Sequence, residues 1–530
     1  MPTPARQQFL RIVRDNRDGA DPRTLCVPIV VRLLSDQLTP VLAYRRLVAD
    51  DERTAPSFLL ESVENGQHQG RHSLLGAQPA IEFIATGNDV RIVDHRGGGV
   101  QRQRLDDPLT RLREIAAGYR LIQPDGLDLP LLGGWVGYAG YDAVRYSEPT
   151  KLGWADAPTD DRHLPDLQFG FYDNLVVFDH VDKLVNIVQL ATVGPDDDPE
   201  LRYADACHRL DGRIAQIERH SKPLVLGRLR PQRAARPLPS NLSREQHAAM
   251  VERVLEYIRA GDVYQCVVGQ RFERTSTADP FDVYRALRTV NPSPYMVYMQ
   301  GQGCILVASS PEILCRVHRD GDGRLIVTNR PLAGTRRRGS TPEEDLALER
   351  DLLADHKERA EHAMLVDLGR NDVGRVAVPG SIGLDKVMEV ERYSHVMHIS
   401  STVTGVLRDN LDCWDALRAT LPVGTISGAP KIRAMQIIDE LEPVRRGPYG
   451  GGMGYVGLDG RMDIALTLRT MVVPTALRDG SQWTYHIQAA GGIVADSKPE
   501  AEYQETINKA AALARAIDTA EEAFGREVTE

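Results

Sequence analysis

Two segments of this 530-residue chain carry glutamates at a spacing that suits metal binding. They are HKERAEHAM, with Glu358 and Glu361, and EYQETINKA, with Glu502 and Glu505. Residues at i and i+3 are neighbours on a helix surface, so each pair presents two carboxylates on one face. If the two faces oppose each other, they form an oxygen-only site that favours Mg²⁺. The spacing alone is also compatible with a solvated helix surface.

Three glycine-bearing turns could bind an anion through backbone N–H groups. They are Ala333-Gly334-Thr335, residues 424–428 (GTISG) and Ala490-Gly491-Gly492. Glycine lets the backbone approach a ligand closely, and a helix N-terminus adds positive potential. The segment GTISGAPK is not a nucleotide P-loop, because its lysine is not followed by a Ser or Thr that would bind magnesium.

Two further residues place polar chemistry in apolar surroundings. Arg469 stands in the strand-like run IALTLRTMVV, and His398 stands in HVMHISS. A guanidinium in such a strand is either an edge residue or a fork that binds a carboxylate through two N–H groups. A lone histidine among apolar residues is more often a hydrogen-bonded core residue than a catalyst.

The elements that must position these residues are strands mixed with long helices, without strict alternation. Ser243 and Gln246 form a capping-box pattern that starts a helix, and Gly261 ends it. Further helices are predicted over 281–290, 342–366, 428–441 and 500–520, and strands over 263–272, 295–300, 304–309, 325–328, 464–473 and 483–489, with a hairpin within 171–190. This pattern predicts an α+β fold with largely antiparallel sheets, and no repeat of fixed period is visible.

Composition bounds the domain organisation and the partners. A proline- and arginine-rich stretch, 221–242, predicts a linker between an N-terminal lobe, 1–220, and a C-terminal domain, 243–530. The net charge of -10 argues against a nucleic-acid partner. No apolar stretch approaches the ~20 residues of a membrane span. The six cysteines are scattered without a Cys-x-x-Cys pair, as expected of reduced thiols in the cytoplasm.

Several motifs occur in one fixed order between residues 261 and 509. They are GDVYQ, NPSPYM, SSPEIL, RPLAGTRRRG, KERAEHAMLVDLGRND, HVMH, GTISGAPKIRAM, YGGGMGY, LRT and AAGGIVADSKPEAEYQET. The N-terminal part adds LLES, GRHSLLG and GGWVGYAGYDAVR. In this order the motifs resemble the chorismate-utilising enzymes, and within them the synthase subunits of anthranilate synthases.

The resemblance implies a fold, an activity and partners. The fold is two largely antiparallel sheets packed against each other with helices outside and an intertwined N-terminal regulatory lobe. The activity is conversion of chorismate and ammonia to anthranilate and pyruvate, the first step of tryptophan biosynthesis, with Mg²⁺ as cofactor and L-tryptophan as feedback inhibitor. A separate glutaminase supplies the ammonia, in a dimer of heterodimers.

The resemblance also implies roles for individual residues. Glu361 and Glu505 would hold Mg²⁺, and Glu358 and Glu502 would complete the site. Glu312 would be the general acid for the departing 4-hydroxyl and His398 would serve pyruvate loss, with Thr425 and Gln265 also in the catalytic set. Chorismate would be bound by Gly334, Thr335, Tyr449, Arg469, Ala490, Gly491, Gly492 and Lys509. L-tryptophan would be bound by Leu60, Glu61, Ser62, Pro294, Tyr295, Met296 and Tyr455.

Two positions separate the possible reactions. Aminodeoxychorismate synthases typically carry a covalently acting lysine where this chain has Ala333, and relatives that form isochorismate or salicylate activate water with a lysine where it has Gln265. With neither lysine, ammonia is the expected nucleophile. The alternatives are an aminodeoxychorismate synthase and a catalytically silent tryptophan sensor. Ala490 and Gln436 depart from the family pattern.

None of the six cysteines stands in a Gly-x-Cys-x-Gly elbow, the setting of a glutaminase nucleophile. The chain is therefore expected to depend on a partner for glutamine-derived ammonia.

Overall fold

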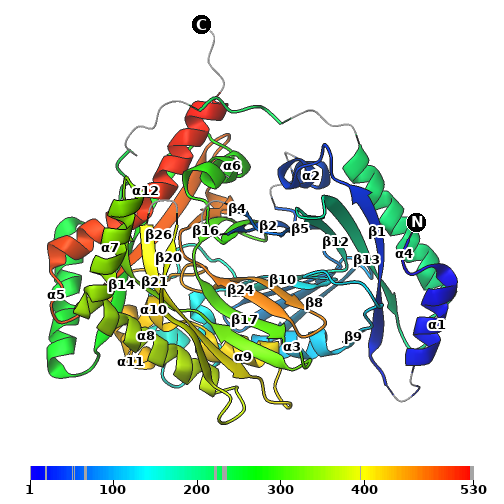
Figure 1. Ribbon diagram of the computed structural model, residues 1–530, viewed down its shortest axis with the longest axis horizontal. Coiled ribbons are helices and arrows are strands. Elements are labelled where there is room, and N and C mark those ends of the chain that lie inside the picture. The colour runs from blue at the N-terminus through cyan, green and yellow to red at the C-terminus, as the bar shows by residue number, and fades with distance from the viewer. Residues whose placement is uncertain are drawn as a thin grey trace, which may run out of the picture.

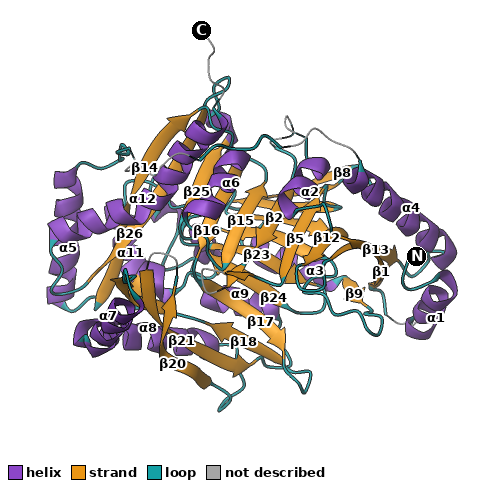
Figure 2. Cartoon of the chain, turned by 45° about the horizontal axis from the view of Figure 1, so that its top comes forward, coloured by secondary structure: helices purple, strands orange, loops and turns teal. Residues whose placement is uncertain are grey.

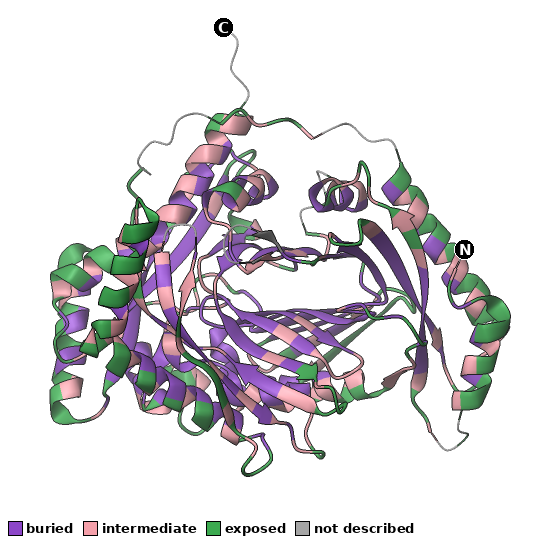
Figure 3. Ribbon diagram, in the orientation of Figure 1, coloured by how far each residue is buried: buried purple, intermediate pink, exposed green. Residues whose placement is uncertain are grey.

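Two large β-sheets packed face to face form the centre of the protein. The computed structural model describes residues 2–17, 19, 21–49, 52, 54–64, 68–219, 224–229, 236–393 and 396–525. Side chains from both sheets, such as Phe58 and Leu74 from one and Val136 and Met453 from the other, meet in a shared apolar core. Helices cover the outside, with exposed outer faces over buried strands (Figure 3).

The first sheet contains, in spatial order, β22 (Gly428–Ala429), β14 (Gln265–Ser276), β26 (Trp483–Ile493), β25 (Thr470–Pro474), β16 (Cys304–Ser310), β15 (Tyr295–Gln300), β2 (Ser57–Glu61), β5 (His72–Ala77), β12 (Asn174–Asp179), β13 (Leu184–Val193), β1 (Thr24–Leu34) and β9 (Tyr119–Leu121). Its strands pair antiparallel except β9, which is parallel to β1.

The second sheet contains β19 (Leu332–Arg337), β21 (Val396–Val406), β18 (Leu325–Asn329), β17 (Ile313–Arg319), β24 (Met462–Leu466), β23 (Gly452–Gly457), β10 (Gly134–Ala139), β11 (Leu167–Tyr172), β6 (Ile81–Thr86), β7 (Asp89–Asp94) and β8 (Gly99–Arg104), with β20 (Gly383–Arg392) beside β21. A short hairpin, β3 (Val63–Glu64) and β4 (His68–Gln69), stands apart. The largely antiparallel α+β fold is confirmed.

The helices are α1 (Arg6–Asn16), α2 (Pro40–Leu47), α3 (Pro108–Ala117), α4 (Pro199–Glu218), α5 (Arg244–Ala260), α6 (Pro280–Val290), α7 (Pro342–Ala354), α8 (His356–Gly374), α9 (Cys413–Thr420), α10 (Gly424–Ser427), α11 (Lys431–Leu441) and α12 (Pro499–Phe524), with 3₁₀ turns at Tyr141–Tyr146, Trp154–Asp156 and Thr475–Leu477. None of the helices in the described ranges is long and apolar enough to cross a membrane.

Both sheets are built from two similar halves. Reading outward from the middle of the first sheet, β15, β16, β25, β26 and β14 on one side match β2, β5, β12, β13 and β1 on the other. In the second sheet β23, β24, β17, β18 and β21 match β10, β11, β6, β7 and β8 in the same way. Figure 1 shows α1 and α4 on one flank and α5 and α12 on the opposite flank. The fold therefore contains an internal duplication that the sequence does not display as a repeat.

The predicted division into 1–220 and 243–530 follows these halves along the chain, but each sheet runs continuously across it. Figure 2 shows the strands of both parts side by side in the sheets. The predicted linker, 221–242, lies partly outside the described residues, and independent folding of either part stays a prediction.

Several predicted boundaries differ from the structure. The helix predicted over 342–366 is two helices, because Asp355 ends α7 and caps α8 by accepting hydrogen bonds from Lys357 N and Glu358 N. The helix predicted from 428 begins at Lys431, and Gly428–Ala429 pairs as β22 with β14. The capping box of Ser243 and Gln246 and the left-handed Gly261 that ends α5 are confirmed.

A buried ion pair ties α11 to the first sheet. The side chains of Arg446 and Glu442 are 1% and 3% exposed. Arg446 donates to Glu442, to Ile426 O and to Val267 O, the last two at 2.7 Å. Glu442 also accepts from Gly269 N at 3.0 Å. The pair thus joins the segment after α11, the end of α10 and β14.

Glu442→Gln is expected to lower the free energy of unfolding by about 3–5 kcal/mol, because it leaves a buried guanidinium without its carboxylate. Urea titration followed by circular dichroism measures the effect. Glu440→Gln, at a half-exposed glutamate in the last turn of α11 that pairs with Arg253, is the control and should change stability by less than about 1 kcal/mol. Equal stability of the two variants would contradict this account.

Candidate active site

The chain passes from one sheet to the other at two adjacent places, and each carries a predicted site residue. Glu312 lies between β16 and β17, and Arg469 lies between β24 and β25. The two crossings are hydrogen-bonded to each other: Ser309 N donates to Arg469 O at 3.1 Å, and Leu466 N donates to Glu312 O at 3.0 Å. The backbone itself therefore brings the acid and the guanidinium into one region.

Glu312 is a buried carboxyl group, 4% exposed. Burial raises its pKa to about 8, and the Thr425 hydroxyl, which donates to Glu312 Oε1 at 2.9 Å, only partly opposes this shift. Glu312 consequently keeps its proton at neutral pH and can act as a general acid. This geometry agrees with the role expected for Glu312 and brings Thr425 to it.

Arg469 does not lie within a strand, as the sequence suggested, but at the break between two strands in different sheets. Its φ of 47° is in the left-handed region, which fits a sharp crossing rather than a pleated strand. Its guanidinium donates to Lys509 O of α12 at 2.5 Å, and Tyr449 and Glu505 are among the groups that act on its pKa. The crossing thus turns the guanidinium toward α12.

His398, on β21, is neutral and oriented. Burial lowers the pKa of His398 to about 4. Its Nδ1 lies 3.0 Å from Gly334 O and 3.0 Å from Thr335 Oγ1. Because a carbonyl oxygen only accepts, Nδ1 carries the proton and Nε2 keeps a lone pair. The structure therefore leaves the Nε2 atom of His398 able to accept a proton, next to Gly334 of β19.

Gly334 itself needs to be glycine. Its φ is 66°, and a Cβ there would lie 3.2 Å from Glu358 Oε2. The predicted Ala333-Gly334-Thr335 turn is instead an irregularity within β19, and it places the Gly334 backbone directly beside a carboxylate of α8.

The carboxylates of α8 and α12 converge on the end of β14 and β26. Gln265 Nε2 donates to Glu361 Oε1 at 2.8 Å. Burial raises the pKa values of Glu361 and Glu502, and the negative charge of Glu505 adds to both shifts. Burial and then the charge of Glu361 raise the pKa of Glu358. These four carboxylates therefore influence one another across the two helices.

One lysine compensates part of this negative charge. Lys509 Nζ lies 2.6 Å from Glu505 Oε1 and donates to Ala490 O at 2.8 Å. Neighbouring Gly491 and Gly492 leave room for side chains from both sides: a Cβ at Gly491 would lie 3.0 Å from Glu502 Oε2, and one at Gly492 would lie 2.6 Å from Gln265 Nε2. The segment Ala490-Gly491-Gly492, predicted as a turn, is part of strand β26. Its glycines face Glu502 of α12 and Glu361 of α8.

The side chains do not form a closed metal cage. Within the described part of the chain, no three Asp, Glu, His or Cys side chains are grouped closely enough to hold a metal ion. The donor chemistry nevertheless fits Mg²⁺, because all four groups are oxygen donors and Glu502 Oε2 is buried without a hydrogen-bond partner. Mg²⁺ binding by Glu361, Glu505, Glu358 and Glu502 stays a prediction.

A buried ion pair that the sequence did not reveal fixes α8 against α11. Lys431 Nζ contacts both carboxylate oxygens of Asp372 at 2.6 Å, and both side chains are at least nine-tenths buried. Lys431 belongs to GTISGAPK and Asp372 to the GRND run, so the pair joins the helix of Glu358 and Glu361 to the segment of Thr425. No pattern in the sequence paired these two residues, which lie 59 positions apart.

The residues expected to bind L-tryptophan lie on adjacent strands but on both faces of the first sheet. Met296 of β15 is directly opposite Glu61 of β2. Because side chains alternate along a strand, these two face α6, whereas Leu60 and Tyr295 face the second sheet. Glu61 accepts from Tyr284 OH at 2.6 Å and Arg288 at 3.0 Å.

On the face between the sheets, Tyr295 OH donates to Asp463 at 2.9 Å, and Leu60 and Tyr455 pack against the same apolar core. Glu61 therefore has its hydrogen-bond partners on α6, and its role in binding L-tryptophan stays a prediction. Ser62 and Pro294 are half-buried beside these strands.

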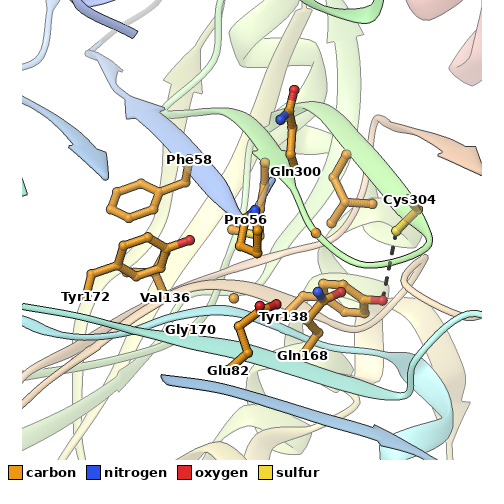
Figure 4. Close-up of a pocket in the computed structure, with 14 residues that line it drawn as sticks. Pro56, Phe58, Glu82, Val136, Tyr138, Gln168, Gly170, Tyr172, Gln300 and Cys304 are labelled. Atoms are coloured by element: carbon orange, nitrogen blue, oxygen red, sulfur yellow. Dashed lines mark hydrogen bonds between the residues drawn. The ribbon is translucent and has the colours of Figure 1, made fainter. Parts of the chain in front are cut away.

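A separate small cavity lies between the sheets and is lined by residues of both halves (Figure 4). Tyr138, whose hydroxyl contacts Cys304 Sγ at 3.9 Å, Gln168 and Glu82 line it. Its volume of about 20 Å³ suits roughly one water molecule. None of the predicted site residues is among the described residues that line this cavity.

Comparison with known proteins gives a consistent result. Residues 55–515 match the family described as chorismate binding enzyme. The chain is 52% identical to "Anthranilate synthase alpha subunit 1, chloroplastic" of Oryza sativa subsp. indica, over 94% of this chain and 89% of that protein. It is 44% identical to "Anthranilate synthase component 1" of Pseudomonas putida, over 98% and 99% of the two chains.

Solved structures agree on the fold. Anthranilate synthase component I from Streptococcus pneumoniae superposes with a TM-score of 0.70 at 35% identity, over 91% of this chain and 99% of that one. The isochorismate synthase MenF from Escherichia coli superposes with a TM-score of 0.64 at 17% identity, over 96% and 99%, and shares the fold.

Glu312→Gln is expected to become increasingly more stable than the wild type as the pH rises from about 4.5 to about 8. In this interval the folded protein keeps a proton on Glu312 that the unfolded chain has released, because burial raises the pKa from 4.5 to about 8. Stability of the wild type therefore falls with pH, and glutamine carries no such cost. Thermal melts at pH 5 and pH 8 measure the difference, and an equal offset at both would contradict a raised pKa.

Proposed function

The chain belongs to the family of chorismate-binding enzymes, and we propose that it forms anthranilate and pyruvate from chorismate and ammonia. This proposal rests mainly on Glu312, a buried acid that keeps its proton at neutral pH. Backbone hydrogen bonds join the segment of Glu312 to the segment of Arg469. Replacing a ring hydroxyl needs a proton donor, and a substrate with two carboxylates needs cationic groups.

In the first step ammonia attacks ring carbon 2 of chorismate while the 4-hydroxyl leaves. Glu312 gives its proton to the departing oxygen, which leaves as water, and Thr425 keeps the carboxyl oriented through its 2.9 Å hydrogen bond. Arg469, Tyr449 and the backbone of Gly491 and Gly492 bind one carboxylate of the substrate. Fixed charges and dipoles in a dry site lower such a barrier by several kcal/mol.

In the second step ring carbon 2 loses its proton and the bond between ring carbon 3 and the enolpyruvyl oxygen breaks, which makes the ring aromatic. The released enol gains a proton on its methylene carbon and leaves as pyruvate. His398 serves this step, because its Nδ1 proton is held by Gly334 O and its Nε2 lone pair is free to accept a proton. Gly334 and Thr335 line the ring.

Glu361 and Glu505, with Glu358 and Glu502 beside them, would hold Mg²⁺. When bound, Mg²⁺ supplies positive charge for the ring carboxylate. Without a cation these carboxylates repel one another, which contributes to the raised pKa values of Glu358, Glu361 and Glu502.

The absence of two lysines favours ammonia over water and over a covalent route. Ala333 is a buried residue of β19, and Gln265 donates to Glu361, so neither position offers an amine to activate water or attack the ring. An aminodeoxychorismate synthase is the second candidate, and Ala333 speaks against it. Glu312 and His398 in a common site speak against a silent sensor.

Ammonia comes from a glutaminase partner, in a dimer of heterodimers. Burial raises the pKa of Cys266 and Cys315 to about 12 and of Cys304 to about 11, which makes these thiols poor nucleophiles. All six cysteines are free thiols in the structure, as suits a reducing compartment such as the cytoplasm.

L-tryptophan acts as feedback inhibitor at the β2–β15 region. The proposed binding set is Leu60, Glu61, Ser62, Pro294, Tyr295, Met296 and Tyr455, of which Glu61 and Met296 lie on the α6 side of the first sheet. Tyr295 and Asp463 join β15 to β24, the strand that leads to Arg469, so this contact can transmit an effect to the catalytic site. Coupling of about 1–3 kcal/mol is enough for strong inhibition.

The test of the proposed reaction incubates purified protein with chorismate, Mg²⁺ and ammonium and follows anthranilate fluorescence. Anthranilate is the expected product. A para-substituted product or isochorismate would overturn the assignment.

Glu505→Gln is expected to lower Mg²⁺-dependent turnover by at least about a hundredfold, because it removes one of the two principal carboxylates. Turnover is measured across a Mg²⁺ titration. Glu500→Gln is the matched control on α12, since Glu500 is exposed and pairs with Arg244, and it should keep full turnover. An unchanged Mg²⁺ response in Glu505→Gln would disprove the metal assignment.

Ser62→Arg is expected to weaken inhibition by L-tryptophan at least about tenfold and to leave uninhibited turnover nearly unchanged, because the larger side chain fills the proposed pocket. Dose–response curves with L-tryptophan measure this. Undiminished inhibition would refute the pocket.

A further inference from the structure

A cleft in the N-terminal half corresponds by fold position to the catalytic site in the C-terminal half. It has a volume of about 480 Å³, within the range of small-molecule sites. Gln78, Pro79, Asp173 and Asn174 line it, at the crossings from β5 to β6 and from β11 to β12. By strand order these crossings match those from β16 to β17 and from β24 to β25, which carry Glu312 and Arg469.

The correspondence extends to single residues at the crossings. Pro79-Ala80 precedes β6 as Pro311-Glu312 precedes β17. Asp173 directly precedes β12 as Arg469 directly precedes β25. The N-terminal half therefore lacks the acid, which is replaced by Ala80, and it has the opposite charge at the second crossing.

The helices over the two sites correspond as well. Five residues separate β13 from α4, and five separate β26 from α12. Arg209 and Lys509 each lie ten residues after the proline that begins their helix. Arg209 lines the cleft as Lys509 lies at the catalytic site, so both sites keep a cation at the same place on the helix.

The charges of the cleft favour an anion. Arg96, Arg209 and Arg213 line it, and Asp173 is the one carboxylate in its lining. Asp173 pairs with Arg96, and Arg209 pairs at 3.0 Å with the half-exposed Asp205, one turn earlier on α4. Arg213 is 7% exposed and donates only to neutral acceptors, Asn174 Oδ1 at 2.6 Å, Gln216 Oε1 at 3.1 Å and Ala77 O at 3.2 Å. Among the described residues no carboxylate forms a salt bridge with Arg213. A buried guanidinium without such a partner is costly unless an anion neutralises it.

The helix face over the cleft also leaves space for a ligand. Gly212 interrupts α4 between Arg209 and Arg213, and a Cβ there would meet no atom within 4 Å. Glycine inside a helix costs about 1 kcal/mol relative to alanine, so the glycine that leaves this space open also lowers the stability of α4.

We propose that this cleft binds a small organic or inorganic oxyanion, a carboxylate or a phosphate, through Arg96, Arg209 and Arg213. It is a non-catalytic counterpart of the catalytic site, because the duplicated fold keeps the cavity and a helix cation while Ala80 removes the acid. Asn174, Gln189 and Gln216 supply amide groups for the remaining polar atoms of the ligand.

The test measures binding of succinate and of inorganic phosphate to the full-length protein by isothermal titration calorimetry without Mg²⁺. The wild type is expected to bind at least one of them, and the stronger of the two identifies the carboxylate or phosphate class. Gly212→Leu, a good helix former that projects into the cleft, is expected to weaken binding at least about tenfold. Arg209→Gln is expected to weaken it about threefold to tenfold.

Two controls make the result decisive. Gly212→Ala should raise the thermal midpoint and keep most of the affinity, which shows that α4 tolerates substitution. Arg111→Gln removes the same charge from an exposed pair with Glu114 on α3 and should leave binding unchanged. Failure of the wild type to bind either anion, or full binding by Gly212→Leu, would overturn the proposal.

Discussion

The structure depends on one topological constraint, the exchange of the chain between two packed sheets at neighbouring crossings. Along a strand, side chains alternate between the two faces of the sheet. At a crossing the strand pairing stops, so the side chain there does not have to follow this alternation. Glu312 and Arg469 occupy two such positions, and hydrogen bonds at 3.0 and 3.1 Å join their backbones. The acid and the cation are therefore placed by the sheets and not by flexible loops.

Two helices add the carboxylates of the candidate site to the residues at the crossings. α8 and α12 bring carboxylates from segments about 140 residues apart to the end of β14 and β26, where Gln265 and Lys509 bind one of them each. The Lys431–Asp372 and Arg446–Glu442 pairs hold the surrounding segments in place. The duplication repeats the same scaffold in the N-terminal half, but the additional segment from β19 to β20, which contains α8, occurs only in the C-terminal half of the described chain.

Local patterns predicted elements well where neighbours in sequence decide the structure. The capping box at Ser243, the left-handed Gly261 and the hairpin of β12 and β13 are examples. Predictions were wrong where a distant contact decides. Arg469 interrupts an apolar run because β24 and β25 pair in different sheets. The division of a helical run at Asp355 is an exception, because Asp355 caps α8 through residues two and three positions later. The partners of Glu61 come from α6, which is distant in sequence, and no local pattern indicated them.

The amino-acid sequence by itself determined the chemical inventory: which acids, cations and glycines occur, at which spacing, and in which order of motifs. That information is local, because helix spacing, caps and turns depend on residues a few positions apart. Only the tertiary structure decided which of these residues meet and that Glu312 is buried enough to keep its proton. It also showed that two halves without a visible sequence repeat share one strand order. Burial and pairing depend on contacts across hundreds of residues, and no local pattern contains them.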